Sequence, residues 1–158
     1  KKIHALGKGA KNRDLLCDAA REMGLEAVAS DNAQQAVESA DIVVSSIPLT
    51  SQVEPFIAAS WLKPGAFIAS TDSGLPWKKD SLHLFDRLVI DDLKQEAAMP
   101  VPMMDMGLID GDLTGLVEAK VAARQSGDER TAFIFRAVAL GDLALATLVY
   151  QKVTEQAG

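Results

Sequence analysis

The sequence predicts an α/β protein, a doubly wound parallel sheet with helices on both faces. Short apolar runs alternate along the chain with segments of helical spacing, which is the βαβ pattern of such a sheet. Two of the runs, in 40–48 and 62–72, have no polar alternation and end abruptly in hydroxyl or carboxyl side chains. Runs of this kind are typical of parallel strands that are covered on both faces.

Composition limits the class of protein further. A chain of 158 residues is long enough for one domain with a substantial core. The formal net charge of −6 provides no basic field for nucleic acid or an anionic membrane. The apolar runs are shorter than the roughly 20 residues of a transmembrane helix, and the first residues show no signal-peptide pattern. We therefore expect a cytoplasmic protein with no nucleic-acid or membrane partner.

Six segments are predicted to be strands because they are short, apolar and bounded by turn residues. They are residues 3–6, 27–29, 42–45, 66–70, 88–90 and 131–135.

The segments between the strands have apolar residues at helical spacing or begin at a residue type that caps helices. They are the helices expected at 12–23, 31–37, 55–61, 79–85, 92–99, 113–121 and 141–151. Asn12, Asp31 or Asn32, and Asp92 occupy predicted N-cap positions, and Gly24 occupies a predicted helix end.

Several residues that often carry chemistry are assigned to packing instead. Cys17 and Trp77 are expected in the core, and the methionines of 99–106 in the core or an interface. His4 and His83 have no second ligand at metal-binding spacing, so no metal site is expected.

Polar side chains follow two of the predicted strands at the point where each strand ends. Ser45 and Ser46 close one run, and Ser70, Thr71 and Asp72 close the next. In open α/β sheets, ligands bind outside the carboxyl ends of the strands. We therefore expect a cofactor and a substrate to meet at this edge.

The loop after the first strand is an incomplete nucleotide-binding turn. A dinucleotide-binding unit opens with a strand and a G-x-G-x-x-G turn, whose glycines let the backbone approach the pyrophosphate. Gly7-Lys8-Gly9 follows the first strand, but Asn12 stands at the position of the third glycine. Two interpretations are open: a degenerate turn, or a chain that begins at the second strand of the fold.

Six tracts carry, by their order and spacing, a resemblance to a known family, and this resemblance favours the second interpretation. They are residues 40–44, 62–68, 89–92, 111–116, 134–137 and 141–146. Together they resemble the ornithine cyclodeaminase and mu-crystallin family over nearly the whole chain. In that family a dimerising substrate domain precedes a Rossmann-like NAD(P)-binding domain, and the C-terminal segment returns towards the first domain.

The resemblance implies a domain organisation. Residues 1–140 are expected to form the cofactor domain without its first strand and glycine turn, and residues 141–158 a helix that returns towards a substrate domain. A homodimer formed through that N-terminal domain is expected as well. One departure is that the family usually shows a Gly before the closing helix, where this chain has Val138-Ala139-Leu140.

The resemblance also implies an enzyme. Members of this family transfer a hydride between an amino acid or cyclic imine and a nicotinamide cofactor, as cyclodeaminases, dehydrogenases or reductases. The residues present do not indicate which of these reactions the protein catalyses. The chain alone is expected to be inactive. The alternatives are a non-catalytic NADP(H)-binding protein of the mu-crystallin type and a different Rossmann oxidoreductase.

Asp72 aligns with the strand-end aspartate of the family, so the resemblance assigns it as the catalytic residue. A carboxylate at this edge can serve as a general base or stabilise an iminium ion. The alternative is a turn-forming aspartate in Asp72-Ser73-Gly74.

Seven residues are expected to contact the cofactor, namely Gly7, Lys8, Ser45, Ser46, Ile47, Ser70 and Thr71. Lys8 follows the first strand, where an acidic residue binds the ribose of NAD and a cation accommodates the 2′-phosphate of NADP. No carboxylate occurs before Asp14. The sequence thus favours NADP(H) over NAD(H), unless Lys8 is only a solvated loop lysine.

Overall fold

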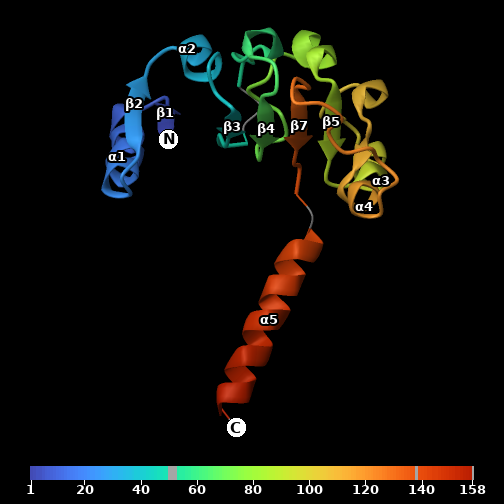
Figure 1. Cartoon of the computed structure of the whole chain (residues 1–158). Coiled ribbons are helices and arrows are strands. Elements are labelled where there is room, and N and C mark those ends of the chain that lie inside the picture. Colours follow the sequence, from blue (N-terminus) through green and yellow to red (C-terminus); the bar gives the residue numbers. More distant parts are fainter. Residues whose placement is uncertain (50–52, 138, 158) are drawn as a thin grey trace.

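A five-stranded parallel sheet forms the centre of the computed structural model, which describes residues 1–49, 53–137 and 139–157. Its strand order is β3-β4-β7-β5-β6 (Figure 1). The strands are β3 (Ile42–Ser45), β4 (Phe67–Ser70), β7 (Thr131–Ile134), β5 (Arg87–Ile90) and β6 (Gly111–Asp112). Every pairing is parallel, and Ser45, Ser70 and Ile134 share one register. The predicted α/β class and parallel sheet are confirmed.

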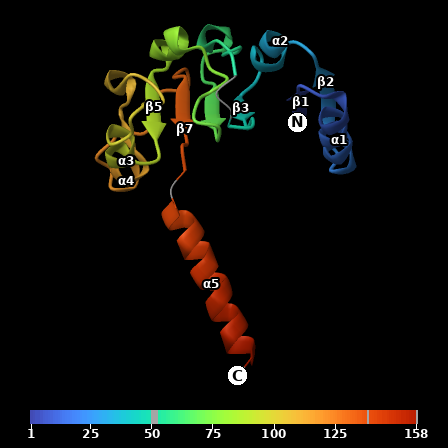
Figure 2. The same cartoon turned by 180° about the vertical axis from the view of Figure 1, so that it is seen from behind.

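A second sheet consists of two parallel strands, β1 (Lys2–Leu6) and β2 (Glu26–Ser30). The helix α1 (Ala10–Glu22) connects them, and α2 (Ala33–Val37) leads from β2 to β3. Figures 1 and 2 show this pair beside the larger sheet, with β1 nearer to β3 than β2 is. Among the described residues β1 and β3 are not hydrogen-bonded to each other, so each has an open edge.

The remaining helices are short, except for the last. They are η1 (Ala59–Trp61), η2 (Lys79–Leu84), α3 (Leu93–Ala97), η3 (Met106–Leu108), α4 (Leu113–Val117) and α5 (Ala139–Ala157), where η denotes a 3₁₀ helix. The side chains of Asn32 and Asp92 accept hydrogen bonds from the first turns of α2 and α3, as predicted for N-caps.

Three helix predictions were wrong in detail. The first helix begins at Ala10 after an extended Gly9, not at Asn12, because Ala10 and Lys11 favour helix and Gly is an acceptable N-cap. Of 113–121 only residues 113–117 are helical, and of 55–61 only the last three. The backbone N–H of Ile57 is instead hydrogen-bonded to the carbonyl of Pro76 at 2.8 Å.

The core lies on one face of the larger sheet and contains Ile68, Leu88, Ile90 and Ile134, all nearly inaccessible to solvent. Trp77 is also buried and meets Phe85 edge to face, with ring centroids 5.9 Å apart. Cys17 is buried between α1 and the smaller sheet, so it packs as predicted.

The opposite face of β3 is uncovered. Ile42 and Val44 are 64% and 67% exposed, although both are apolar and lie in the middle of the chain. Residues two apart on a strand share a face, so this exposed surface is continuous along β3. It borders the open edge of the larger sheet.

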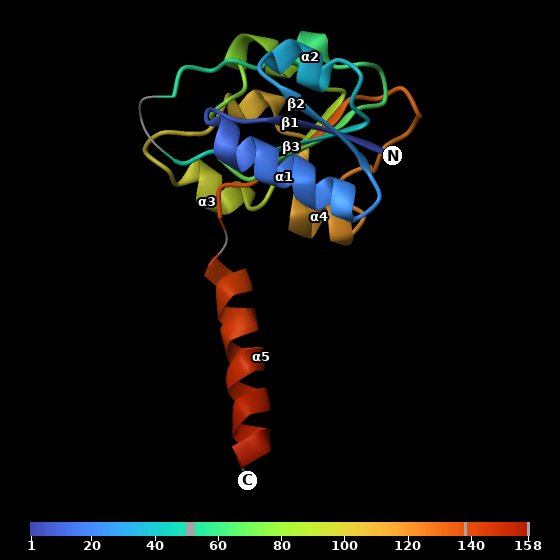
Figure 3. The ribbon, with the colours of Figure 1, turned by 90° about the vertical axis from the view of Figure 1, so that its left-hand side faces the viewer.

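The helix α5 runs away from the sheet as a separate rod (Figures 1 and 3). Its apolar side chains are exposed around the whole helix, and include Leu143, Leu145, Leu148, Val149, Tyr150 and Val153. A helix that is apolar all round is normally buried. No helix in the described ranges is long and apolar enough to cross a membrane.

Gly65, shortly before β4, packs closely against Gly127 in the loop before β7, and substitutions of glycine test this packing. Gly65 has φ +79°, and a Cβ atom there would lie 2.4 Å from the carbonyl oxygen of Gly127. Gly24 has φ +75° with no atom within 4 Å of such a Cβ. Gly24→Ala should therefore cost only the left-handed strain, about 1–2 kcal/mol of unfolding free energy. Gly65→Ala should cost at least about 1 kcal/mol more because of the clash. Urea unfolding of both variants measures the difference, and equal losses would contradict this packing.

Candidate active site at the carboxyl edge of the sheet

The parallel register brings the ends of four strands to one edge of the larger sheet. Along this edge lie residues 45–47 at the end of β3, 70–75 at the end of β4, 135–137 after β7 and 91–92 after β5. Ser45 from one predicted run, and Ser70 and Asp72 from the next, therefore come together here.

Asp72 is the centre of a buried hydrogen-bond network. Its side chain is inaccessible to solvent. Oδ1 accepts hydrogen bonds from the hydroxyls of Ser45, at 3.1 Å, and Ser70. Oδ2 accepts from the backbone N–H of Ile47 at 3.3 Å. These donors compensate the carboxylate for its removal from water, although no cation contacts it among the described residues.

The two hydroxyls are themselves held by further donors. The Nε1–H group of buried Trp77 donates to Ser45 Oγ at 3.3 Å, and the backbone N–H of Gly74 donates to Ser70 Oγ at 3.2 Å. Both hydroxyl protons are therefore committed to Asp72. Ser45 and Ser70 contribute to the shape of this edge without a free donor for a ligand.

Asp72 also begins a tight turn. The N–H group of Leu75 donates to the carbonyl of Asp72 at 3.1 Å, and φ is positive at both Ser73 (57°) and Gly74 (71°). Positive φ at both central residues is the pattern of a type I′ turn. The turn-forming role that the sequence left open is thus present in the structure, together with the buried carboxylate.

Two of the predicted cofactor contacts lie on the outside of the same edge. Ser46 and Thr71 are exposed, and the Thr71 hydroxyl donates to the carbonyl of Ser45 at 3.2 Å. Ile47 is half-buried, and its N–H group is used by Asp72. The edge therefore has an inner layer of satisfied groups and an outer layer that a ligand can reach.

Gly7 and Lys8 lie at the carboxyl end of β1, in the smaller sheet, and both are exposed. A Cβ atom on Gly7 would lie 3.5 Å from Cβ of Arg13. Arg13 contacts Asp14, at 3.1 Å, and Asp31. The hydrogen bond to Asp14 and the attraction of both carboxylates raise the pKa of Arg13 despite partial desolvation. The structure places this loop at the carboxyl end of its own sheet but does not bring it into contact with Asp72.

Two further buried carboxylates, those of Asp91 and Glu96, were not predicted as part of a site from the sequence. Glu96 is buried and pairs with Arg136, with Arg136 Nε 2.7 Å from Oε2, while Asp91 accepts from the backbone N–H of Ala137 at 2.9 Å. Burial raises the pKa of Glu96, but hydrogen bonds from Arg136 and the Met103 N–H, with the charge of Arg136, lower it overall. The tracts at 89–92 and 134–137 contain Asp91 and Arg136, but they gave no partner for Arg136.

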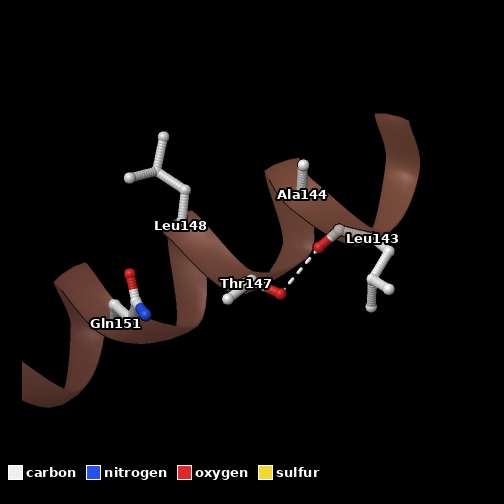
Figure 4. A pocket seen from close by; sticks show the side chains of 5 residues that line it. All are labelled: Leu143, Ala144, Thr147, Leu148 and Gln151. Atoms are coloured by element: carbon white, nitrogen blue, oxygen red, sulfur yellow. Dashed lines mark hydrogen bonds between the residues drawn. The ribbon is translucent and has the colours of Figure 1, made fainter. Parts of the chain in front are cut away.

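Two other hollows do not form the site. A groove of about 310 Å³ lies between α3 and α4, where Asp112 accepts from the N–H groups of Leu93 and Gly115. The Gly115 hydrogen bond lowers the pKa of Asp112. The other groove, of about 460 Å³, is lined by α5 alone, at Leu143, Ala144, Thr147, Leu148 and Gln151 (Figure 4). It is one side of a single helix, away from the sheet edge.

The chain as a whole matches a known family. The model of the ornithine cyclodeaminase/mu-crystallin family matches residues 1–157. The chain belongs to this family. The expected resemblance is thereby confirmed, and the parallel sheet with its polar carboxyl edge is that of a Rossmann-like member.

Individual relatives are more distant. The chain is 27% identical over 131 residues to the nodulation efficiency protein NfeD of Rhizobium meliloti, covering 80% of this chain and 39% of that protein. It is 26% identical over 137 residues to N-((2S)-2-amino-2-carboxyethyl)-L-glutamate dehydrogenase of Staphylococcus aureus, covering 82% and 40%. The chain thus spans well under half the length of these curated relatives.

A solved structure shares the fold. The Δ(1)-pyrroline-2-carboxylate reductase of Thermococcus litoralis, in complex with NADH and L-proline, superposes with a TM-score of 0.82 at 22% sequence identity. The match covers 99% of this chain and 51% of the reductase. At this identity the similarity establishes the Rossmann-like fold.

The described residues contain no group of three or more His, Cys, Asp or Glu side chains arranged to hold a metal ion.

The network around Asp72 predicts a stability effect. Asp72→Asn should lower the unfolding free energy by about 1–3 kcal/mol, because the new NH₂ group must face either the Ile47 N–H or two hydroxyls that already donate. Asp80→Asn, at an exposed position, is the matched control and should change little. Urea unfolding compares the two variants. Equal stability of Asp72→Asn and the wild type would contradict the network.

Proposed function

We propose that this chain is the NAD(P)-binding domain of an enzyme that transfers a hydride between a nicotinamide cofactor and an amino acid or cyclic imine. The observation that carries the proposal is the layered edge around Asp72, in a chain of the ornithine cyclodeaminase/mu-crystallin family. Exposed Ser46 and Thr71 stand where a Rossmann-like sheet receives its ligand. The dehydrogenase and reductase names of its relatives support the same reaction class.

In this proposal the cofactor contacts are Gly7, Lys8, Ser46, Ile47 and Thr71, with Ser45 and Ser70 shaping the edge beneath them. Oxidation of an amine to an iminium develops positive charge on the substrate. A preorganised negative charge stabilises such a transition state. Asp72, held by its three donors, would supply that charge as the catalytic carboxylate.

A non-catalytic NADP(H)-binding protein is the second candidate. The observation that favours it is the complete burial of Asp72, since every hydrogen bond described for its carboxylate is made to the chain itself. Such a protein would bind the cofactor at the same edge and release it unchanged.

The domain organisation is also a proposal. β1 pairs in parallel with β2, β3 pairs in parallel with β4, and both β1 and β3 have an open edge; Ile42 and Val44 are exposed on β3. We propose that one further strand, carrying the glycine turn, joins the two sheets, and that a following helix covers this face. The exposed apolar surface of α5 would then pack on a substrate domain through which a homodimer forms.

Deuterium transfer tests the reaction. NADPH that carries deuterium at both C4 positions is incubated with a panel of cyclic imines and the polypeptide that carries the chain with its substrate domain. The product should carry deuterium on the carbon of the former C=N bond. Binding without turnover would favour the non-catalytic candidate, and a product without deuterium would contradict hydride transfer. Residues 1–158 alone should show no turnover.

Cofactor preference is tested at Lys8. The loop after β1 carries Lys8, and the first turn of α1 carries Lys11 and no acidic residue, so NADP(H) is the proposed cofactor. A hydrogen bond to a charged group contributes about 1.5–3 kcal/mol, or roughly ten- to a hundred-fold in affinity. Lys8→Asp should weaken NADPH by at least that factor and leave NADH unchanged or tighter. Lys79→Asp, another exposed lysine, is the control.

Titration by nicotinamide fluorescence gives both affinities. If the ratio of NADPH to NADH affinity is the same in wild type and Lys8→Asp, Lys8 is a solvated loop residue and NADP preference has no support.

A further inference from the structure

The chain leaves the sheet through Phe135-Arg136-Ala137, called here the exit segment. It follows β7 directly and leads towards α5. Ala137 has φ 151°, a conformation that residues with a side chain rarely adopt. Strain of this kind persists only where the surroundings determine the backbone firmly.

One short stretch after β5 supplies those surroundings. Asp91 Oδ2 accepts hydrogen bonds from the N–H groups of Arg136 and Ala137, at 3.0 and 2.9 Å. Gln95 Nε2 donates to the carbonyl of Ala137 at 3.0 Å. The carboxylate of Glu96 accepts from Arg136 Nε and Nη2, at 2.7 and 3.1 Å. Both backbone polar groups of the strained residue are therefore bonded to side chains.

Both carboxylates in these contacts are buried, so the loss of a contact is costly. Asp91 and Glu96 are 5% and 1% exposed, so removing a partner from either carboxylate leaves a charge without compensation. Arg136 Nη2 also donates to the carbonyl of Val101 at 3.0 Å, and the N–H group of Met103 donates to Glu96. The guanidinium is thus fixed from two sides.

The exit segment also holds the Asp72 turn. Phe135 donates its N–H to the carbonyl of Ser70 at 2.8 Å, and its carbonyl accepts from the N–H of Ser73 at 3.1 Å. Ser73 has the positive φ of the turn. Phe135 therefore lies between two strained residues, Ser73 on one side and Ala137 on the other.

We propose that Asp91, Gln95 and Glu96 form a clamp on the exit segment that positions α5 and the Asp72 turn together. The three are positioning residues, since Asp91 and Gln95 act through the backbone of Arg136 and Ala137, and Glu96 acts through the Arg136 side chain. The inference goes beyond the proposed function and does not depend on the cofactor or the reaction.

The direction of α5 gives the first test. Spin labels are placed on exposed positions, at Lys79→Cys in η2 and Gln151→Cys in α5, with Cys17 replaced by Ala. Pulsed dipolar spectroscopy then measures the distance distribution between the labels. Glu96→Gln places an amide NH₂ against the Arg136 donors and should at least double the width of the distribution. Glu118→Gln, which removes the exposed ion pair with Lys120, is the matched control and should leave it unchanged.

The Asp72 turn gives the second readout. The amide of Ser73 should exchange hydrogen at least ten-fold faster in Glu96→Gln than in Glu118→Gln. If Glu96→Gln does not fold by circular dichroism, Gln95→Ala is used, because it removes only the donor to the Ala137 carbonyl. A folded variant with an unchanged distance distribution or unchanged Ser73 exchange would overturn the proposal.

Discussion

The carboxylate of Asp72 is buried without a cation in the described structure, and the edge around it depends on how that charge is satisfied. Removing an ionised carboxylate from water is costly unless donors replace the solvent. Here they come from the ends of two neighbouring strands, through Ser45, Ile47 and Ser70. The hydrogen bonds therefore fix how β3 and β4 end relative to each other. Trp77 extends the same network into the core.

This arrangement separates structure from ligand contact along the edge. Groups that satisfy Asp72 are buried, whereas Ser46 and Thr71 remain exposed in front of them. On the far side of β4, the exit segment and the clamp continue the same edge, and again buried carboxylates hold backbone amides. An edge built in this way is preorganised, since its polar groups are already bonded before a ligand arrives. The proposed hydride transfer would use that rigidity.

Much of the sheet was predictable from the sequence because its signals are local. The apolar run at 42–45 became β3 with the predicted bounds, and Asp92 caps α3 as its position before a helical segment indicated. The polar residues at the strand ends follow from the same pattern. The sequence does not show which distant side chains contact each other. Glu96 and Arg136 form an ion pair although they are 40 residues apart, and no local pattern near either residue indicates the contact. The hydrogen bonds to Asp72 depend likewise on the pairing of β3 with β4.

Strand pairing also explains the separation of the two sheets. Local patterns place β1 and β2 correctly, but whether β1 joins β3 depends on what lies between them. The missing glycine before α5 is a related case. The sequence has no glycine at 138–140, and at Ala137, directly before that stretch, the structure shows a backbone conformation that a glycine would adopt without strain.

The central claim is that a nicotinamide dinucleotide binds along the carboxyl edge. Amide chemical shifts measured by NMR during titration with NADPH, on the isotope-labelled polypeptide that carries this chain, test it most directly. The account predicts the largest changes at Gly7, Ser46 and Thr71, with Lys94 and Lys120 in the groove between α3 and α4 unaffected. Changes confined to that groove, or to α5, would contradict it.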